Sequence, residues 1–326
     1  MPAPSISLGD IEITRVVEWS GPILTARFVI PDSDEAMWRH NEDWLAPDFW
    51  TPADDAFRCH IQTWVVRSEG RTILVDTGVG NDRERPQVPQ FTGLRTDYLT
   101  RLREAGVEPE DVDVVVNTHI HYDHVGWNTE WRDGQWVPTF PNATYMIPRA
   151  DNLYFDPKNP RRAPGDEHER LRWEGSTLVF NDSIAPIHHA GQAVLWKDTH
   201  RIDGSLLLEP APGHTPGSSV LTLRSGADRA VFVGDMLHSP VQVLEPGWNS
   251  CFCDDPQLAA KTRRAYLSRA AELRELIIPA HWPGHGAAEV RRDGDGFAIT
   301  AWSAFPSGSQ GTEPGTHGGV QRGNGH

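Results

Sequence analysis

The segment Thr118-His119-Ile120-His121-Tyr122-Asp123-His124-Val125-Gly126 places three imidazoles and one carboxylate within six residues. The residues before it, Asp111-Val112-Asp113-Val114-Val115-Val116-Asn117, contain a run of valines that predicts a buried strand. The cluster therefore lies where a core strand ends and a loop begins. In α/β proteins, functional residues commonly occupy that position.

The spacing of these side chains predicts a metal site. In an extended or turning segment residues i and i+2 point the same way, so His119 and His121 can face one ion. Asp123 and His124 follow the turn and more naturally face a second ion. Neutral imidazole suits zinc, iron, cobalt or manganese, and carboxylate oxygen suits the harder of these ions. The alternative is a polar loop with incidental histidines, which so dense a set of donors disfavours.

This segment resembles the signature of the metallo-β-lactamase-fold hydrolases, and three later segments resemble the rest of that family's ligand set. They are Gly213-His214-Thr215-Pro216-Gly217-Ser218, Val233-Gly234-Asp235 and Ile277-Ile278-Pro279-Ala280-His281. All four occur in the family's order. The resemblance implies an α/β fold, the metallo-β-lactamase αββα sandwich, in which two mixed sheets lie face to face with helices outside.

The resemblance also implies a set of seven metal ligands. His119, His121 and His214 would hold the first ion. Asp123, His124 and His281 would hold the second, and Asp235 would bridge the two. The expected cofactor is a pair of divalent ions, zinc first, with manganese, cobalt and iron as alternatives.

Two of these ligands, Asp123 and Asp235, are also expected to be catalytic. Two cations about 3.5–4 Å apart lower the pKa of water and polarise a carbonyl or phosphoryl oxygen. Asp123 lies on the same loop as the ligands, so it can accept the proton of the attacking oxygen.

Two residues near the ligands have expected supporting roles. Asp76, in Asp76-Thr77-Gly78, is expected to accept a hydrogen bond from a ligating ring, or else to be a turn residue before Gly78. His285 is expected to support the site or the fold rather than to bind an ion.

Composition excludes several partners. Acidic residues number 45 and basic residues 30 in a chain of 326, and the net charge of −15 argues against nucleic acid. No apolar run reaches the length of a membrane span, and the N-terminus lacks the features of a signal peptide, so we expect a cytoplasmic protein with no membrane partner. The three cysteines, Cys59, Cys251 and Cys253, are expected to be ordinary thiols.

The chain is expected to form one hydrolase domain over residues 1–302. The Gly-, Ser-, Thr- and Pro-rich tail, 303–326, is expected to be disordered. Residues 31–58 form an aromatic loop that either packs into the domain core or lines an interface or ligand groove. Residues 151–176 form an insertion with some helix, either a lid or a solvated loop.

Alternating and apolar runs predict the other elements. Strands are expected at 11–18, 62–67, 72–76, 111–117, 143–148, 206–210, 219–223 and 229–233, with a last one leading to His281. Helices are expected from Thr92 as N-cap to Ala105, and from Asp255-Pro256 to about Leu276.

The segment from Thr118 to Asn128, the Gly213–Ser218 segment and the aromatic loop most resemble the branch of quorum-quenching lactonases and methyl-parathion-hydrolase-like enzymes. The resemblance implies hydrolysis of small neutral, partly apolar lactones or esters, as by an N-acyl-homoserine lactonase, with phosphotriesters as further substrates. It also implies a homodimer formed through the N-terminal loop.

Other functions are disfavoured by particular residues. A glyoxalase-II-like thioesterase would need Arg or Lys clamps for substrate carboxylates, and Arg263-Arg264 is the candidate pair. A β-lactamase would lack the bridging aspartate that Asp235 provides. A non-catalytic binding module on this fold would have lost ligands, and none is lost here.

Overall fold

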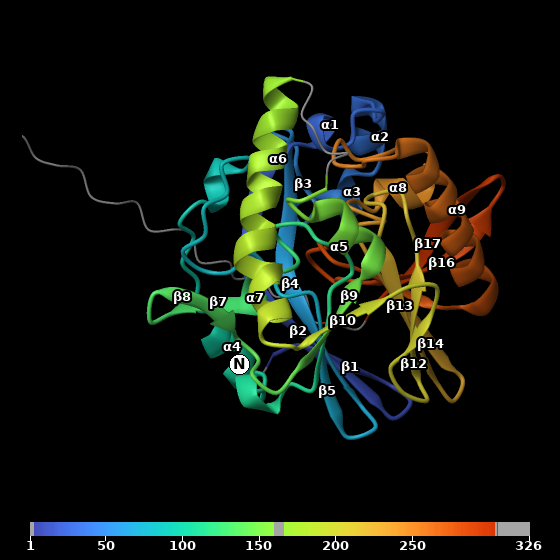
Figure 1. Ribbon diagram of the computed structural model, residues 1–326. Helices are drawn as coiled ribbons and strands as arrows, with labels where there is room; N and C mark the ends of the chain where they lie inside the picture. Colours follow the sequence, from blue (N-terminus) through green and yellow to red (C-terminus); the bar gives the residue numbers. More distant parts are fainter. Residues whose placement is uncertain (1–2, 160–165, 304, 306–326) are drawn as a thin grey trace, which may run out of the picture.

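The computed structural model describes residues 3–159, 166–303 and 305, which build two facing β-sheets flanked by helices (Figure 1). The first sheet has the order β1-β2-β4-β5-β6-β9-β10, with β3 paired to β4. Its strands are β1 (Ser5–Leu8), β2 (Ile11–Thr25), β3 (Trp50–Thr51), β4 (Ala56–Ser68), β5 (Arg71–Val75), β6 (Val114–Val116), β9 (Thr144–Pro148) and β10 (Ala193–Trp196).

The second sheet comes from the later half of the chain, in the order β11-β12-β13-β14-β15-β16-β17. Its strands are β11 (His200–Arg201), β12 (Leu206–Pro210), β13 (Ser219–Ser225), β14 (Asp228–Gly234), β15 (Leu276–Pro279), β16 (Ala288–Asp293) and β17 (Gly296–Trp302). Both sheets are mixed, since β5-β6-β9-β10 and β14-β15 are parallel and the other neighbours are antiparallel. A separate hairpin joins β7 (Thr129–Arg132) and β8 (Gln135–Pro138).

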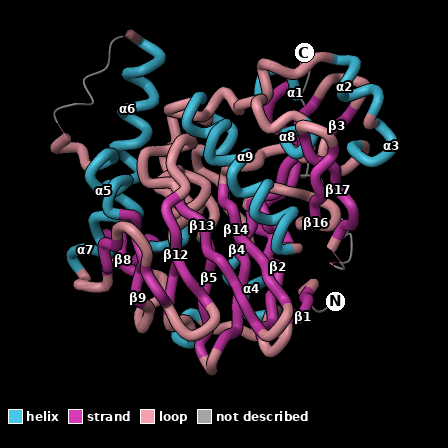
Figure 2. The backbone as a smooth tube through the Cα atoms, turned by 90° about the vertical axis from the view of Figure 1, so that its right-hand side faces the viewer, coloured by secondary structure: helices cyan, strands magenta, loops and turns pink. Residues whose placement is uncertain are grey.

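Helices flank the two sheets, and some of them cover an outer face (Figure 1). They are α1 (Ala26–Val29), α2 (Glu35–His40), α3 (Glu42–Leu45), α4 (Tyr98–Glu104), α5 (Arg149–Phe155), α6 (Glu167–Val179), α7 (Ala185–His189), α8 (Val241–Leu244) and α9 (Pro256–Leu273). Leu267 of α9 packs with Val231 and Ile277 of the second sheet, and α9 lies along that face in Figure 2. Leu102 of α4 and Ile187 of α7 pack against the first sheet. None of the helices in the described part of the chain is both long and apolar enough to cross a membrane.

The core between the sheets is made by alternate side chains of both. Ile13, Val66 and Ile73 of the first sheet meet Leu221 and Phe232 of the second, and all five are buried. Alternation places one face of each strand inward, so the period-2 pattern of the sequence fixes which side chains meet here. The predicted αββα sandwich is confirmed.

Most predicted elements are present, with shifted ends. The first strand runs on to Thr25, and the valine strand is shorter, covering Val114–Val116. Asp255 caps α9 by accepting a hydrogen bond from the Leu258 amide, as predicted. The helix expected from Thr92 starts only at Tyr98, because the Thr92 hydroxyl accepts a hydrogen bond from the Arg85 amide instead.

The expectation of one long aromatic loop over 31–58 is wrong, since α2, α3 and β3 lie within it. Trp38 and Trp50 are fully buried and pack in the domain core, so the first of the two predicted roles holds for them. Phe57 serves both roles because it is buried in that core and also lines a cavity of about 280 Å³.

The predicted boundary at residue 302 is a few residues early. Phe305 is buried between the sheets, with its ring 5.1 Å from that of Trp64. Of the tail predicted to be disordered, 303–326, residues 303 and 305 are described and buried, and the rest lies outside the described residues.

Strand β2 carries a buried carboxylate that holds the segment after β5. Glu18 accepts hydrogen bonds from the amides of Val79 (2.7 Å) and Gly80 (3.1 Å) and from the Trp127 indole (2.6 Å). Gly78 has a positive φ of 61°, and a Cβ there would overlap the Glu18 carboxylate. Burial raises the pKa of Glu18 to about 7, although the hydrogen bonds oppose the shift.

We predict that wild-type protein loses unfolding free energy relative to Glu18→Gln as the pH rises from 4.5 to about 7. The folded protein holds the Glu18 proton more tightly than the unfolded chain, so deprotonation in this window favours unfolding, by at most about 3 kcal/mol. Denaturant titrations of both proteins at the two ends of the window measure the difference. A difference that stays constant with pH would contradict the prediction.

Candidate metal centre

All seven predicted ligands meet at one end of the sandwich, where core strands of both sheets end. His119, His121, Asp123 and His124 follow β6. His214 lies between β12 and β13, Asp235 directly follows β14, and His281 follows β15. Because the carboxyl ends of β6, β14 and β15 point to the same edge, residues more than 100 positions apart come together.

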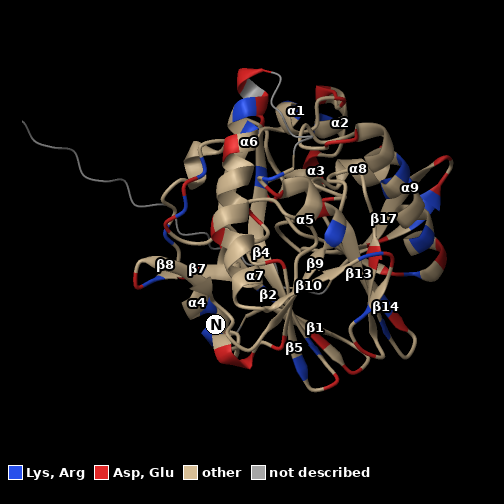
Figure 3. Cartoon of the chain, in the orientation of Figure 1, with Lys and Arg blue, Asp and Glu red and all other residues tan. Residues whose placement is uncertain are grey.

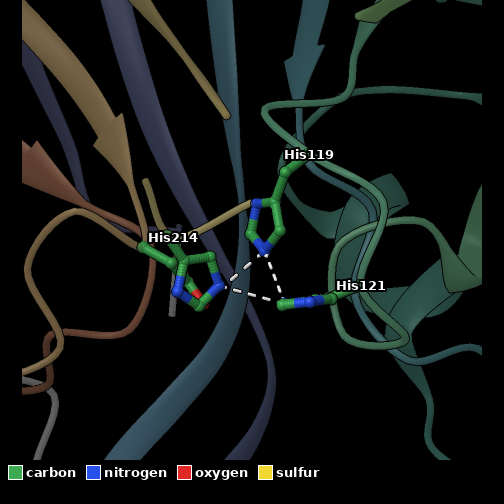
Figure 4. A group of neighbouring side chains, drawn as sticks. His119, His121 and His214 are labelled. Carbon is green, nitrogen blue, oxygen red and sulfur yellow. Dashed lines mark hydrogen bonds and ion pairs between the residues drawn. The ribbon is translucent and has the colours of Figure 1, made fainter. Parts of the chain in front are cut away.

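The first group consists of three histidines whose rings face one another (Figure 4). His121 Nδ1 lies 3.0 Å from His119 Nε2 and 3.0 Å from His214 Nε2. With a carboxylate oxygen of Asp235, their donor atoms all lie within 4.8 Å of one another. The i and i+2 spacing of His119 and His121 thus directs both rings to one point, as predicted.

The second group consists of Asp123, His124 and His281, whose donor atoms also lie within 4.8 Å of one another. His281 Nε2 is 3.1 Å from His124 Nε2 and 3.4 Å from Asp123 Oδ2. The sequence had assigned the same three residues to the second ion.

Asp235 lies between the two groups. Its Oδ2 is 3.3 Å from His214 Nε2, and its Oδ1 is 3.0 Å from His281 Nε2 and 3.2 Å from His124 Nε2. Burial would raise the pKa of this carboxyl, but the charges of His124 and His281 lower it well below its usual range. A carboxylate with one oxygen toward each group is the geometry that a bridging ligand needs.

The donor set fits two divalent ions. Around an ion at the usual Zn–N distance of about 2.0–2.1 Å, tetrahedral ligand nitrogens lie about 3.3 Å apart. The spacings of 3.0 Å and 3.1 Å between ring nitrogens are close to that value. Burial lowers the pKa of His119 and His121 well below 6.5, which keeps these two imidazoles neutral. In the other three rings, those of His124, His214 and His281, burial also lowers the pKa, but Asp235 and other neighbours together outweigh it and raise the pKa.

The outer nitrogens of several rings have partners that fix ring orientation. His124 Nδ1 donates to Asp76 Oδ2 at 2.8 Å, which confirms the supporting role predicted for Asp76. His281 Nδ1 donates to the His60 carbonyl at 2.8 Å. Asp76 also accepts hydrogen bonds from the Thr118 amide and hydroxyl, so it ties the first ligand loop to β5.

Asp151 supports the first group and was not recognised from the sequence. It is fully buried at the start of α5, inside the segment expected to be a lid or a solvated loop. Its Oδ2 accepts from the Ile120 amide and the Thr215 hydroxyl, both at 2.9 Å, and its Oδ1 accepts from the Gly217 amide at 2.6 Å. The beginning of that segment therefore connects the two ligand loops, and no local pattern signals this.

His238 is a second residue that the sequence analysis missed. Its ring is buried in the cavity wall, with Nε2 3.3 Å from Asp235 Oδ2. Burial lowers its pKa to about 4, which keeps the ring neutral. Its position three residues after Asp235 on a segment that follows a core strand was the available signal.

Other candidate residues from the sequence lie outside both groups. His285 stacks on Trp302, at a ring distance of 6.1 Å, which agrees with a supporting role. Cys253 Sγ lies 3.9 Å from His214 Nδ1, and Cys251 lines the cavity, but neither belongs to a candidate ligand group among the described residues.

A cavity of about 280 Å³ opens onto both groups. His121, Asp123, Asp235 and His281 form its floor, and the wall is mostly apolar. The wall includes Ile23, Phe28, Phe57, Ile61, Val88, Phe91, Phe155, Val179 and Phe252. Arg172 on α6 pairs with Asp254 in the wall, at 3.3 Å, so the later part of the 151–176 segment contributes to the cavity as a wall.

Comparison with known proteins agrees with this geometry. The family model that describes the sequences of the metallo-beta-lactamase superfamily matches residues 56–281 of this chain. A probable metallo-hydrolase of Methanocaldococcus jannaschii is 46% identical over 184 residues, which are 55% of this chain and 62% of that protein. An N-acyl homoserine lactonase of Bacillus cereus is 25% identical over 174 residues, which are 50% of this chain and 57% of that protein. The chain thus spans less than two thirds of the length of either relative.

Two solved structures share the fold over almost the whole chain. The hydrolase AbOPH of the beta-lactamase superfamily has a TM-score of 0.74 at 22% identity, covering 92% of this chain and 97% of its own. AidC, described as a dizinc quorum-quenching lactonase in complex with a product, has a TM-score of 0.71 at 20% identity with the same coverage of both chains.

We predict that Asp151→Asn weakens ion binding at the first group. The amide oxygen can replace one carboxylate oxygen as an acceptor, but the NH₂ group would face a donor at the position of the other, so the two ligand loops lose a connection. Loss of such an outer partner typically costs about 10–100-fold in metal affinity. Competition with a chromophoric chelator measures the affinity, and Asp156→Asn, at the end of the same helix, is the matched control. Equal affinities for both variants would contradict the prediction.

Proposed function

Because the chain belongs to the metallo-beta-lactamase superfamily, we propose that it is a dinuclear metal-dependent hydrolase that opens lactones or cleaves esters of neutral, partly apolar molecules. The observation that carries this proposal is the apolar cavity whose floor is formed by residues of both candidate metal groups. The naming of one sequence relative as an N-acyl homoserine lactonase supports a lactone as the substrate.

The charges around the cavity favour a neutral substrate. Arg172 and Asp254 pair with each other in the wall, which leaves little net charge to attract a substrate carboxylate. In Figure 3, Lys and Arg are interspersed with Asp and Glu over the outer helices and loop ends. An acyl chain would bury apolar surface against Phe57, Ile61 and Phe91.

The thioesterase alternative loses its candidate clamp. Arg263 is buried and donates to the carbonyls of Met236 (2.8 Å) and Trp248 (2.8 Å), so it holds the chain after Asp235. Arg264 is exposed and donates to the Asp295 carbonyl. Neither side chain lines the cavity.

When bound, the two ions would supply Lewis acidity for the carbonyl oxygen and lower the pKa of the attacking water. The chain's own residues do the rest. Asp235 directs one carboxylate oxygen to each group, which fixes their separation. Asp123 lines the cavity beside His281 and accepts the proton of the attacking water, then passes it to the leaving alkoxide. The neutral ring of His238 lies 3.3 Å from Asp235 Oδ2. It also lines the cavity, so it limits the space available to the substrate.

Several finer points belong to the same proposal. Zinc is the proposed metal, because imidazole-rich sites of this geometry suit it. A homodimer and a cytoplasmic location are also proposed. Leu24, 42% exposed in the N-terminal region, would be partly covered in such a dimer. Light scattering on the purified protein measures its mass, and a monomer would contradict the dimer.

We predict that zinc-loaded protein opens a medium-chain N-acyl homoserine lactone and that Asp235→Ala abolishes the activity, because the connection between the two groups is lost. Proton release gives the rate. Asp228→Ala, at the opposite end of the same strand, is the control and should keep wild-type activity. If wild-type protein carries two ions and opens neither lactones nor esters, the proposal is wrong, and thioesters and phosphotriesters become the substrates to test.

We predict that Phe28→Ala slows hydrolysis of long-chain substrates selectively. Phe28 lies at the cavity mouth, and removal of its ring takes away apolar contact worth about 1 kcal/mol, or about five-fold in kcat/KM. A short-chain substrate that does not reach the mouth should be unaffected. Leu273→Ala removes another exposed apolar side chain, remote from the cavity, and serves as the control. Equal losses for short and long chains would contradict this use of the cavity.

A further inference from the structure

The second metal group is assembled from two distant parts of the chain. Asp123 and His124 are neighbours on one loop, so their relative placement is local. His281 comes from the segment after β15, in the other sheet. Its distance from the other two therefore depends on how that segment is fixed across the sandwich.

Donors from the first sheet hold successive carbonyls of this segment. Gln62 Nε2 on β4 donates to the Ala280 carbonyl at 2.9 Å. The His60 amide donates to the His281 carbonyl at 3.0 Å, and His281 Nδ1 donates back to the His60 carbonyl at 2.8 Å.

Arg15 on β2 holds the next part of the segment. Its Nη2 donates to the Trp282 carbonyl at 2.7 Å, and its Nη1 donates to the Gly284 carbonyl at 2.6 Å. Its Nε donates to Gln62 Oε1 at 2.6 Å, so one guanidinium orients the amide that holds Ala280. The carbonyls on both sides of His281 are thereby connected to one buried side chain.

The environment of Arg15 is unusual for a charged residue. Arg15 is 3% exposed, and the hydrogen bonds of its guanidinium within the described ranges go to carbonyl, amide and imidazole acceptors rather than to a carboxylate. Burial lowers its pKa to about 9, with only a weaker opposing effect from Asp48. Burying an unpaired charge is costly, and an apolar side chain of similar size would avoid that cost. A guanidinium is suited to this position because its rigid fork has donors for several acceptors at once.

We propose that Arg15, acting through Gln62 and the carbonyls of residues 280–284, is a positioning residue for His281 and so sets the affinity of the second metal group. Strand β2 offers no ligand of its own to either group. Its contribution is to fix the separation between His281 and the loop that carries Asp123 and His124. This inference concerns ion binding and holds for any substrate of the hydrolase.

The test is a metal titration of Arg15→Met. Equilibrium dialysis of the metal-free protein against zinc, followed by metal analysis, counts the ions bound and gives an affinity for each site. We expect the first ion to bind as in wild type and the second to bind at least about ten-fold more weakly, the range known for outer partners of ligands. A purely structural loss would instead lower both affinities alike or leave both unchanged, and either result overturns the proposal.

Further variants separate the positioning role from the charge and from folding. Arg15→Lys keeps the charge but not the fork, so it should restore the second site only in part. Gln62→Met removes the donor to Ala280 while Arg15 stays, so it tests the same link in a milder variant should Arg15→Met fail to fold. Circular dichroism checks that each variant is folded.

Arg101→Met is the matched control. Arg101 donates to the Val17 carbonyl of the same strand, at 2.8 Å, but comes from α4 on the outer side. The Arg101→Met protein should bind two ions with wild-type affinities, and a loss of the second site in this variant would overturn the proposal. Because dialysis counts ions without any substrate, an enzyme that binds two ions but opens no lactone would contradict the proposed function and leave this inference standing.

Discussion

The site depends on one buried carboxylate placed among six buried or nearly buried imidazoles. Asp235 lies within 3.7 Å of five of them, and His121 completes the set through its contacts with His119 and His214. The five are His119, His124, His214, His238 and His281. A charge buried to this extent is stable only if neighbouring groups of opposite charge or bound cations compensate it. The ends of β6, β14 and β15 must therefore stay in register with one another, which links the chemistry of the site to the packing of both sheets.

The polar groups behind the ligands are what keep those strand ends in place. Asp151 connects two ligand loops to each other, and Asp76 connects the first of them to β5. Glu18 and Arg15 connect strand β2 to segments on either side. Each of these four charged side chains is buried and makes three or more hydrogen bonds. Satisfied polar networks of this kind favour a single arrangement, because any shift leaves a buried donor or acceptor without a partner.

The sequence was sufficient to find the residues that gather in the two candidate metal groups, and to find the regular core. His119, His121, Asp123 and His124 lie within one loop, and their spacing alone directs them to two points. Strands such as β13 and β14 have apolar patterns that can be recognised from neighbouring residues alone. Sequence patterns gave wrong predictions where contacts with distant residues determine the local structure. Thr92 pairs with Arg85 instead of capping a helix, and Trp38 and Trp50 are core residues although no period marks their segment.

The supporting residues were out of reach for a different reason. Asp151 joins residues 31 and 64 positions away, and Arg15 joins residues 267 and 269 positions away. Nothing in the sequence near either residue indicates such a partner, so only the folded chain reveals it.

The two sides of the candidate metal centre differ in the kind of contact that they make. Long-range polar contacts behind the two candidate metal groups fix where their side chains lie, whereas the cavity wall in front is mostly apolar. Substitutions in that wall should therefore change which substrate fits while the ions stay in place, which is how one ligand set can serve hydrolases with different substrates on the same fold.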